Sequence, residues 1–152
     1  PGNVAARGRQ MLASCMAGAA FSNAQVGLCH AMAHTIGARF DVHHGLANAI
    51  FLPHVIRFNA PDCMDVYREV ATAFGVDGSG GDPMVADRLA QAIAVFAQGL
   101  GLPAGLSGLG IAQDVLPELA EATLYDAALV YNARTVNDAS EILPLWEAAW
   151  CC

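Results

Sequence analysis

The chain has 152 residues, of which 55% are apolar and only 14% charged, and its formal net charge is −7. This length suits one domain with a sizeable buried core, and the seven basic residues form no patch that would favour nucleic acid or an anionic membrane as a partner. Because typical domains are about 25% charged, the low charge favours association with another protein surface.

The cysteine pattern is typical of reduced thiols in a cytoplasmic protein, because the count is odd and no Cys-x-x-Cys spacing occurs. No signal peptide is expected at the start of the chain. The longest apolar stretch, residues 11–33, contains several polar residues and predicts a buried helix, not a membrane span. The five cysteines are Cys15, Cys29, Cys63, Cys151 and Cys152.

Apolar residues recur at helical spacing in six segments, and no segment alternates apolar and polar residues as a strand does. The first helix is expected either to run on or to restart after Gly27, and to end at Gly37. Pro53 is expected to kink the second helix near residues 50–52, because a proline inside a helix costs about 3 kcal/mol. Residues 1–6 are expected to lack fixed structure. The expected helices cover residues 7–36, 45–58, 64–74, 84–100, 114–125 and 138–150.

Turn and cap signals separate these segments. Residues 59–62 predict a turn with Asp62 as an N-cap, and Asp82 before Pro83 predicts another N-cap. Asp138 and Glu141 have the spacing of a capping box at the start of the last helix. The sequence therefore predicts an all-α fold, a single domain over residues 1–152 with about six helices.

Four histidines lie within residues 30–44, and two of them are four residues apart. His30 and His34 share one face of a helix, and His44 follows after a short loop. Imidazoles from a helix and from the next turn can meet at one point, which is typical of a transition-metal site. The alternative is a coincidental or hydrogen-bonded pair, because HAMAH lacks the glutamate of HEXXH. No role is expected for His43, and His54 is expected to be structural.

Three consecutive stretches around these histidines resemble one family. AGAAFSNAQVGLCHAMAHTIG, then HG, then NAIFLPHVIRFN resemble the second signature of the iron-containing, or group III, alcohol dehydrogenases. The resemblance extends over the whole chain, from RQMLASCMAG to LPELAEATLYDAALVYNAR. It implies that His30 and His44 bind the catalytic divalent metal, Fe²⁺ or Zn²⁺. It also implies that His34 is catalytic and lies near the nicotinamide of NAD(P), with a small alcohol or aldehyde as substrate.

Two parts of the family pattern have no counterpart in the chain. The family's other metal ligands, spaced Asp-x-x-x-His, do not occur, and Gly78, Gly80 and Gly81 follow a helical pattern where a dinucleotide-binding turn follows a strand. The chain therefore resembles the C-terminal part of such an enzyme, and the N-terminal dinucleotide-binding domain is the partner it lacks.

Two functions remain open from the sequence. In the first, the chain is part of a metal- and NAD(P)-dependent alcohol dehydrogenase and is inactive alone, since hydride donor and acceptor must be held together. In the second, it is a truncated, non-catalytic helical module that forms homo-oligomers or binds another partner.

Overall fold

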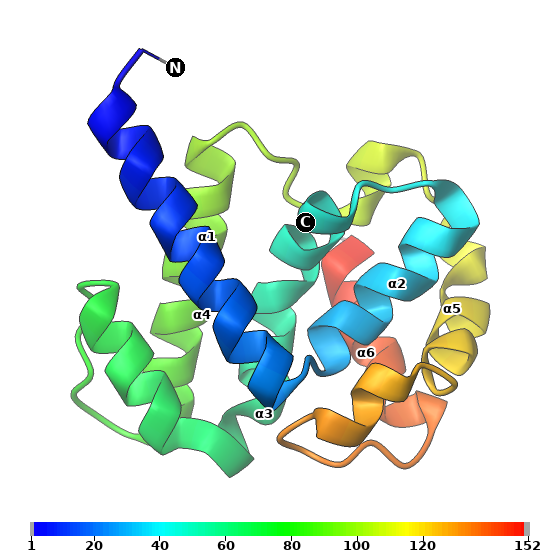
Figure 1. Ribbon diagram of the computed structural model, residues 1–152. Helices are drawn as coiled ribbons and strands as arrows, with labels where there is room; N and C mark the ends of the chain where they lie inside the picture. Colours follow the sequence, from blue (N-terminus) through cyan, green and yellow to red (C-terminus); the bar gives the residue numbers. More distant parts are fainter. Residues whose placement is uncertain (1, 151–152) are drawn as a thin grey trace.

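Six α-helices and three short 3-10 helices make up the computed structural model, which describes residues 2–150, and no strand occurs in that range (Figure 1). The predicted all-α fold is therefore confirmed. The cysteines at 151–152 lie outside the described residues. The α-helices are α1 (Val4–Ala24), α2 (Leu28–Phe40), α3 (His44–Ala73), α4 (Asp82–Gly99), α5 (Leu116–Thr123) and α6 (Ala139–Trp150), and the 3-10 helices are η1 (Leu106–Leu109), η2 (Gln113–Val115) and η3 (Ala127–Tyr131).

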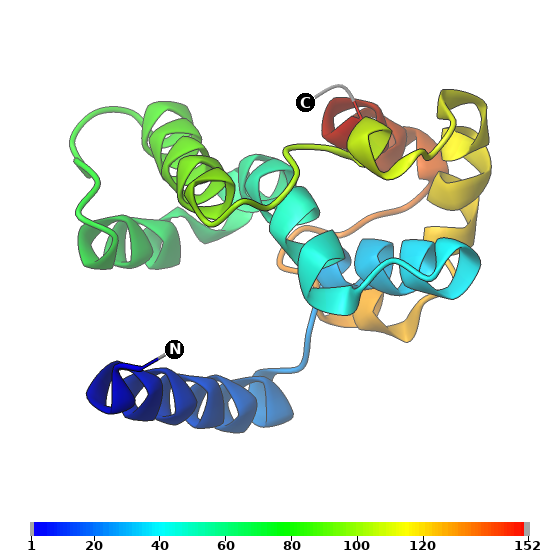
Figure 2. The same ribbon diagram turned by 90° about the horizontal axis from the view of Figure 1, so that it is seen from above.

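The first helix stands apart from the others. Asn3 caps α1 by accepting the N–H of Ala6 at 2.9 Å, so the expectation of an unstructured start is wrong. None of the 21 residues of α1 is buried, and Figure 2 shows the helix lying apart from the rest of the fold. Of the two alternatives left open at Gly27, the structure shows the restart, because α2 begins at Leu28. Gln25, at φ 63° and ψ −173°, turns the chain between the two helices in a conformation that costs about 1–3 kcal/mol.

The second helix passes the glycine that was expected to end it. α2 continues for almost one turn beyond Gly37 to Phe40, and Asp41 then adopts the left-handed conformation. The N–H of Asp41 bonds to the carbonyl of Gly37 at 3.0 Å, which closes the last turn. Gly37 is thus an interior residue, and a three-residue link leads to α3.

The prediction of a kink near residues 50–52 of α3 is wrong, because the break lies further along the helix. Helical dihedral angles continue through Pro53 and through the expected turn at 59–62, and the one non-helical residue inside α3 is Cys63, at φ −147° and ψ 30°. Pro53 is buried and its carbonyl accepts Arg57 Nη1 at 3.2 Å. The break follows Pro61 instead, where Cys63 Sγ lies 3.1 Å from the carbonyl of Asn59.

Two predicted helix caps differ from the structure. Gly81 is the N-cap of α4, and Asp82 lies in its first turn and pairs with Arg68. Asp138 Oδ1 accepts the N–H of Ser140 at 2.8 Å at the start of α6. Glu141 binds the N–H of the residue before Asp138, at 3.0 Å, so the reciprocal bond of the capping box is displaced by one residue.

Two hydrophobic cores share α3. The first joins α2, the first half of α3, α5 and α6, and at its centre Trp146 meets Phe51 edge to face at 4.8 Å between ring centroids. Full burial of a side chain such as Phe51 contributes about 1.5–3 kcal/mol. Within residues 2–150, no helix has the length and apolar character needed to cross a bilayer. The second core, between the rest of α3 and α4, contains Ile56, Ala60, Met64, Ala71, Val85, Ala86, Leu89 and Ala90.

A buried amide junction fixes where α2 begins. Asn132, which follows η3, accepts the N–H of Leu28 at 3.1 Å and so caps α2 from 104 residues away. Its amide also pairs in both directions with that of Asn59 on α3, at 2.7 and 3.0 Å, and donates to the carbonyl of Arg134 at 2.7 Å. The structure thereby holds α2 against α3 with the amide groups satisfied.

Gly27 is required at this junction because a Cβ there would lie 2.8 Å from Asn132 Oδ1 and 3.1 Å from its Cα. We expect Gly27→Ala to lower the free energy of unfolding in urea by about 1–3 kcal/mol, as overpacking does. Gly99→Ala in α4 is the matched control, since no atom outside its own helix backbone and chain neighbours lies within 4 Å of its Cβ position, and it should not lower the free energy of unfolding. Equal stability of the two variants would contradict this assignment.

Candidate functional site

Three histidine rings lie together where α2 meets the start of α3. His30 and His34 lie one turn apart on α2, and His44 is the first residue of α3. The distances between ring centroids are 6.0 Å for His30–His34, 5.2 Å for His30–His44 and 5.4 Å for His34–His44. The short link after α2 thus turns a sequence separation of ten to fourteen residues into ring contact. His43, the N-cap of α3, is exposed.

Local interactions favour the neutral form of His30 and assign a tautomer to His44. Burial lowers the pKa of His30, and the neighbouring His44 and His34 lower it further, while Asp126 acts in the opposite direction. The side-chain nitrogen of Asn48 lies 3.1 Å from Nε2 of His44. An amide N–H can donate only to an unprotonated ring nitrogen, so this bond places the His44 proton on Nδ1.

A thiol and an amide border the cluster. Cys29 Sγ lies 3.4 Å from Oδ1 of Asn48, and burial raises the pKa of Cys29 to about 12. The thiol therefore stays protonated at neutral pH and is a poor nucleophile or metal ligand there.

An acidic residue far along the chain completes the surroundings of His34. Asp126 Oδ2 lies 2.9 Å from His34 Nδ1, and Oδ1 of the same carboxylate accepts the N–H of Ala128 at 2.8 Å. The sequence analysis gave Asp126 no role, because 92 residues separate it from His34 and no spacing rule connects them. The one available signal was its position as an acid before a short helix.

The cluster opens into a groove of about 890 Å³. Phe21 and Gln25 reach it from the end of α1, and Leu52 lies at its edge on α3. The groove thus combines imidazoles with apolar surface, as sites for small molecules usually do. It is lined by Phe21, Gln25, Val26, Cys29, His30, His34, His44, Gly45, Asn48, Ala49 and Leu52.

The donors in the groove fit a transition metal in kind but not in number. Neutral imidazole is a suitable ligand for iron or zinc, and His30 and His44 are close together. However, within residues 2–150 no group of three His, Cys, Asp or Glu residues is arranged to hold a metal ion. The described residues therefore supply only part of a ligand set, since structural and catalytic metal sites use three or four protein ligands.

Comparisons with known proteins identify the family of the chain. The model of the Fe-containing alcohol dehydrogenase family, C-terminal region, matches residues 1–150. The chain belongs to the iron-containing alcohol dehydrogenase family. It is 38% identical to the 1,3-propanediol dehydrogenase of Citrobacter freundii, over 97% of this chain and 38% of that protein. It is 40% identical to the lactaldehyde reductase of Escherichia coli K12, over 91% of this chain and 36% of that protein.

Solved structures give the same relationship. The crystal structure of a 1,3-propanediol oxidoreductase superimposes with a TM-score of 0.91 at 34% identity, over 98% of this chain and 39% of that one. The iron-containing alcohol dehydrogenase from Thermococcus thioreducens gives a TM-score of 0.83, also at 34% identity, over 98% of this chain and 38% of that one. The chain thus spans less than two-fifths of the length of these family members.

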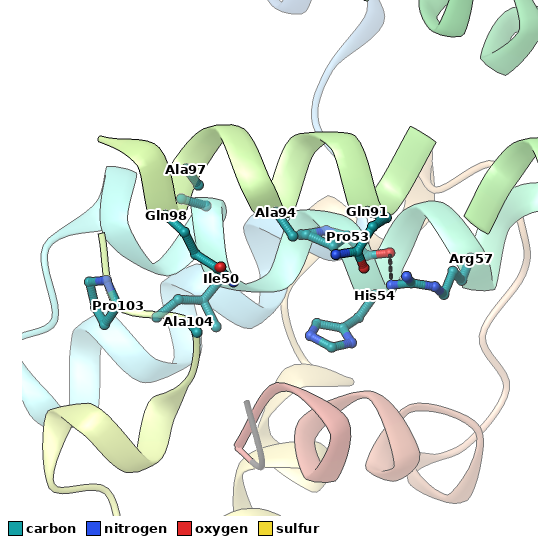
Figure 3. A pocket seen from close by; sticks show the side chains of 11 residues that line it. Ile50, Pro53, His54, Arg57, Gln91, Ala94, Ala97, Gln98, Pro103 and Ala104 are labelled. Carbon is teal, nitrogen blue, oxygen red and sulfur yellow. Dashed lines mark hydrogen bonds between the residues drawn. The ribbon is translucent and has the colours of Figure 1, made fainter. Parts of the chain in front are cut away.

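The fifth histidine, His54, does not line the groove. His54 borders a separate cavity of about 170 Å³ between α3, α4 and residues 103–104. Figure 3 shows His54 and Arg57 toward one end of this cavity and Pro103 and Ala104 toward the other. Burial lowers the pKa of His54 to about 4, and the charge of Arg57 contributes in the same direction. The predicted structural character of His54 stays a prediction.

The lowered pKa makes stability depend on pH. Between pH 6.5 and about 4 the unfolded chain binds a proton at His54 that the folded chain does not, so the free energy of unfolding falls as the pH falls through this range. Allowing for the partial exposure of His54, we expect its share of the loss to be about 1–2 kcal/mol. Urea unfolding of His54→Gln should show a shallower pH dependence than the wild type. The exposed His43→Gln is the control, and identical slopes for all three proteins would refute the assignment.

Proposed function

We propose that this chain is the metal-binding helical part of an NAD(P)-linked alcohol dehydrogenase or aldehyde reductase acting on a small alcohol or aldehyde. Residues 1–152 would form one helical domain, and an N-terminal dinucleotide-binding domain would supply the rest of the site. Family membership supports the reaction class. The single observation that carries the proposal is the convergence of three imidazoles within 5.2–6.0 Å at an apolar groove.

Each groove residue has a role in this proposal. His30 and His44 supply two of the ligands of a divalent metal, Fe²⁺ or Zn²⁺, whose chemistry when bound is Lewis-acid polarisation of the substrate oxygen. The lowered pKa of His30 keeps its lone pair available at neutral pH. Asn48 binds Nε2 of His44, so this amide must turn away, or His44 must turn, before that nitrogen can act as a ligand.

The remaining groove residues orient the reactants. His34 lies at the nicotinamide end, where it orients the cofactor or relays a proton by accepting it at Nε2, while the NAD(P) itself supplies the hydride chemistry. Phe21 and Leu52 cover apolar parts of the groove and exclude water from the reacting groups. Because hydride donor and acceptor must be held in register and the proposal assigns the dinucleotide to another domain, the 152-residue chain is expected to show no turnover alone.

A hybrid enzyme tests this function. The chain would replace the matching segment of the Citrobacter freundii 1,3-propanediol dehydrogenase, and oxidation of NAD(P)H with small aldehydes and Fe²⁺ or Zn²⁺ would be followed by absorbance. We expect turnover in the hybrid and its loss, by at least about 100-fold, in His30→Ala and His44→Ala, as expected for removal of a metal ligand. His54→Gln, outside the groove, should retain activity. A folded hybrid without turnover, or one indifferent to His30 and His44, would contradict the proposal.

One observation favours the second function, a self-associating module. α1 buries none of its residues, and Met11, Met16 and Phe21 on it are 73%, 64% and 53% exposed. Exposed apolar side chains on a helix that packs against nothing mark a candidate contact surface. The helix carries only the two positive charges of Arg7 and Arg9, whereas the whole chain has a net charge of −7. A second copy therefore offers α1 both apolar and oppositely charged surface.

We expect the isolated chain to associate at micromolar concentration, with a homodimer as the simplest product. Light scattering should give a mass above 15.8 kDa. The double variant Leu12→Gln, Met16→Gln on α1 should shift the equilibrium toward monomer, and the matched control Val130→Gln, 82% exposed on η3, should not. A monomer at all concentrations would rule out association through α1.

A further inference from the structure

We propose that Asp126 is a positioning residue that fixes the ring orientation and the tautomer of His34, leaving Nε2 of His34 as a hydrogen-bond acceptor at the groove. This inference rests on the proposed function for its meaning in catalysis. Its evidence is the hydrogen bonding of the Asp126 carboxylate. Neither the family match nor the names of the relatives assign a role to this carboxylate. A hydroxyl group of the substrate or of the cofactor is the chemistry that such an acceptor recognises.

Each oxygen of the Asp126 carboxylate has its own hydrogen-bond partner, and each bond restricts the orientation available to the other. Oδ1 accepts the N–H of Ala128 at 2.8 Å, so Asp126 is the N-cap of η3 and its side chain is held against the backbone. Oδ2 lies 2.9 Å from His34 Nδ1. The Asp126 side chain is only 21% exposed, compared with 45% for His34. Asp126, which is better buried and fixed as the N-cap of η3, therefore holds the more exposed His34.

An ionised carboxylate can only accept hydrogen bonds, so a neutral His34 must carry its proton on Nδ1. Nε2 then has a lone pair and no N–H. The ring is also nearly parallel to that of His44, with an interplanar angle of 19° and 5.4 Å between centroids. The Asp126 bond at one edge and the stacked ring on one face together restrict rotation about the His34 side-chain bonds.

Within the described part of the chain, Asp126 forms no ion pair with a residue other than His34. Arg39, which lines the same surface of α2, makes two bonds to Glu118, at 2.5 and 2.7 Å. Asp126 thus serves two partners, the η3 backbone and His34. A purely structural role as helix cap would need only Oδ1, and the direction of Oδ2 toward Nδ1 is what the positioning role explains.

The substitution Asp126→Asn separates the two roles. The amide oxygen can still accept the N–H of Ala128, so the cap is retained, but the amide nitrogen now faces His34 Nδ1 and must donate to it. His34 is then forced into the opposite tautomer, with the proton on Nε2, and the groove loses its acceptor. Glu118→Gln is the matched control, because it neutralises a nearby carboxylate that contacts Arg39 and not His34.

The experiment is ¹⁵N NMR of the 152-residue chain with labelled histidine, at about pH 8.5, two units above the ordinary pKa of imidazole. The ring-nitrogen shifts and one-bond couplings report which nitrogen of His34 carries the proton. We expect Nδ1–H in the wild type and in Glu118→Gln, and Nε2–H in Asp126→Asn. Thermal unfolding should show similar midpoints for all three.

Two results would overturn the inference. One is a wild-type His34 that is protonated on Nε2 or divided between tautomers, which needs no variant and so stands even if Asp126→Asn fails to fold. The other is a folded Asp126→Asn in which the tautomer is unchanged. Neither readout uses metal, nucleotide or substrate, so an inactive hybrid enzyme would count against the proposed function without affecting this result.

Discussion

The arrangement of the groove depends on the buried amide junction around Asn132. This side chain caps α2 at Leu28 and pairs with Asn59 in the middle of α3, so one residue sets the position of both helices that carry the histidines. A Cβ at position 27 would clash with this amide, so the junction requires a glycine there. Since Asn59 is only 7% exposed, an unpaired amide there would cost about 1–3 kcal/mol, which makes the junction specific as well as stabilising.

Local patterns predicted most of the helices, and long-range contacts account for what they missed. The i, i+4 spacing of His30 and His34 and the short loop before His44 left convergence of the rings open, and the family resemblance was needed to predict that they approach one another. Asp126 and Asn132 were invisible to such rules, because each acts on a residue 92 or more positions away. The mistake at Pro53 comes from a local rule applied by itself. α3 stays helical through the buried Pro53, and its one non-helical residue is Cys63, two positions after Pro61.

The groove and α1 differ in how well they are packed. The groove lies on a well-packed first core, but the helix that supplies Phe21 to its edge has no buried residue of its own. Membership of the iron-containing alcohol dehydrogenase family and a length below two-fifths of its relatives fit this picture. The helices that carry the histidines pack in the first core, and in the function proposed above another region or a second copy would complete the site.

Amide hydrogen exchange at Leu28 tests most directly whether Asn132 positions the histidine-bearing helix. In the native chain this N–H is held by a hydrogen bond to Asn132 and should be protected. In Asn132→Ala it should exchange about tenfold faster or more, the factor that corresponds to one lost bond, and protection along α2 should fall while that of α4 in the second core stays unchanged. Unchanged protection of Leu28 and α2 in a folded Asn132→Ala would contradict the account.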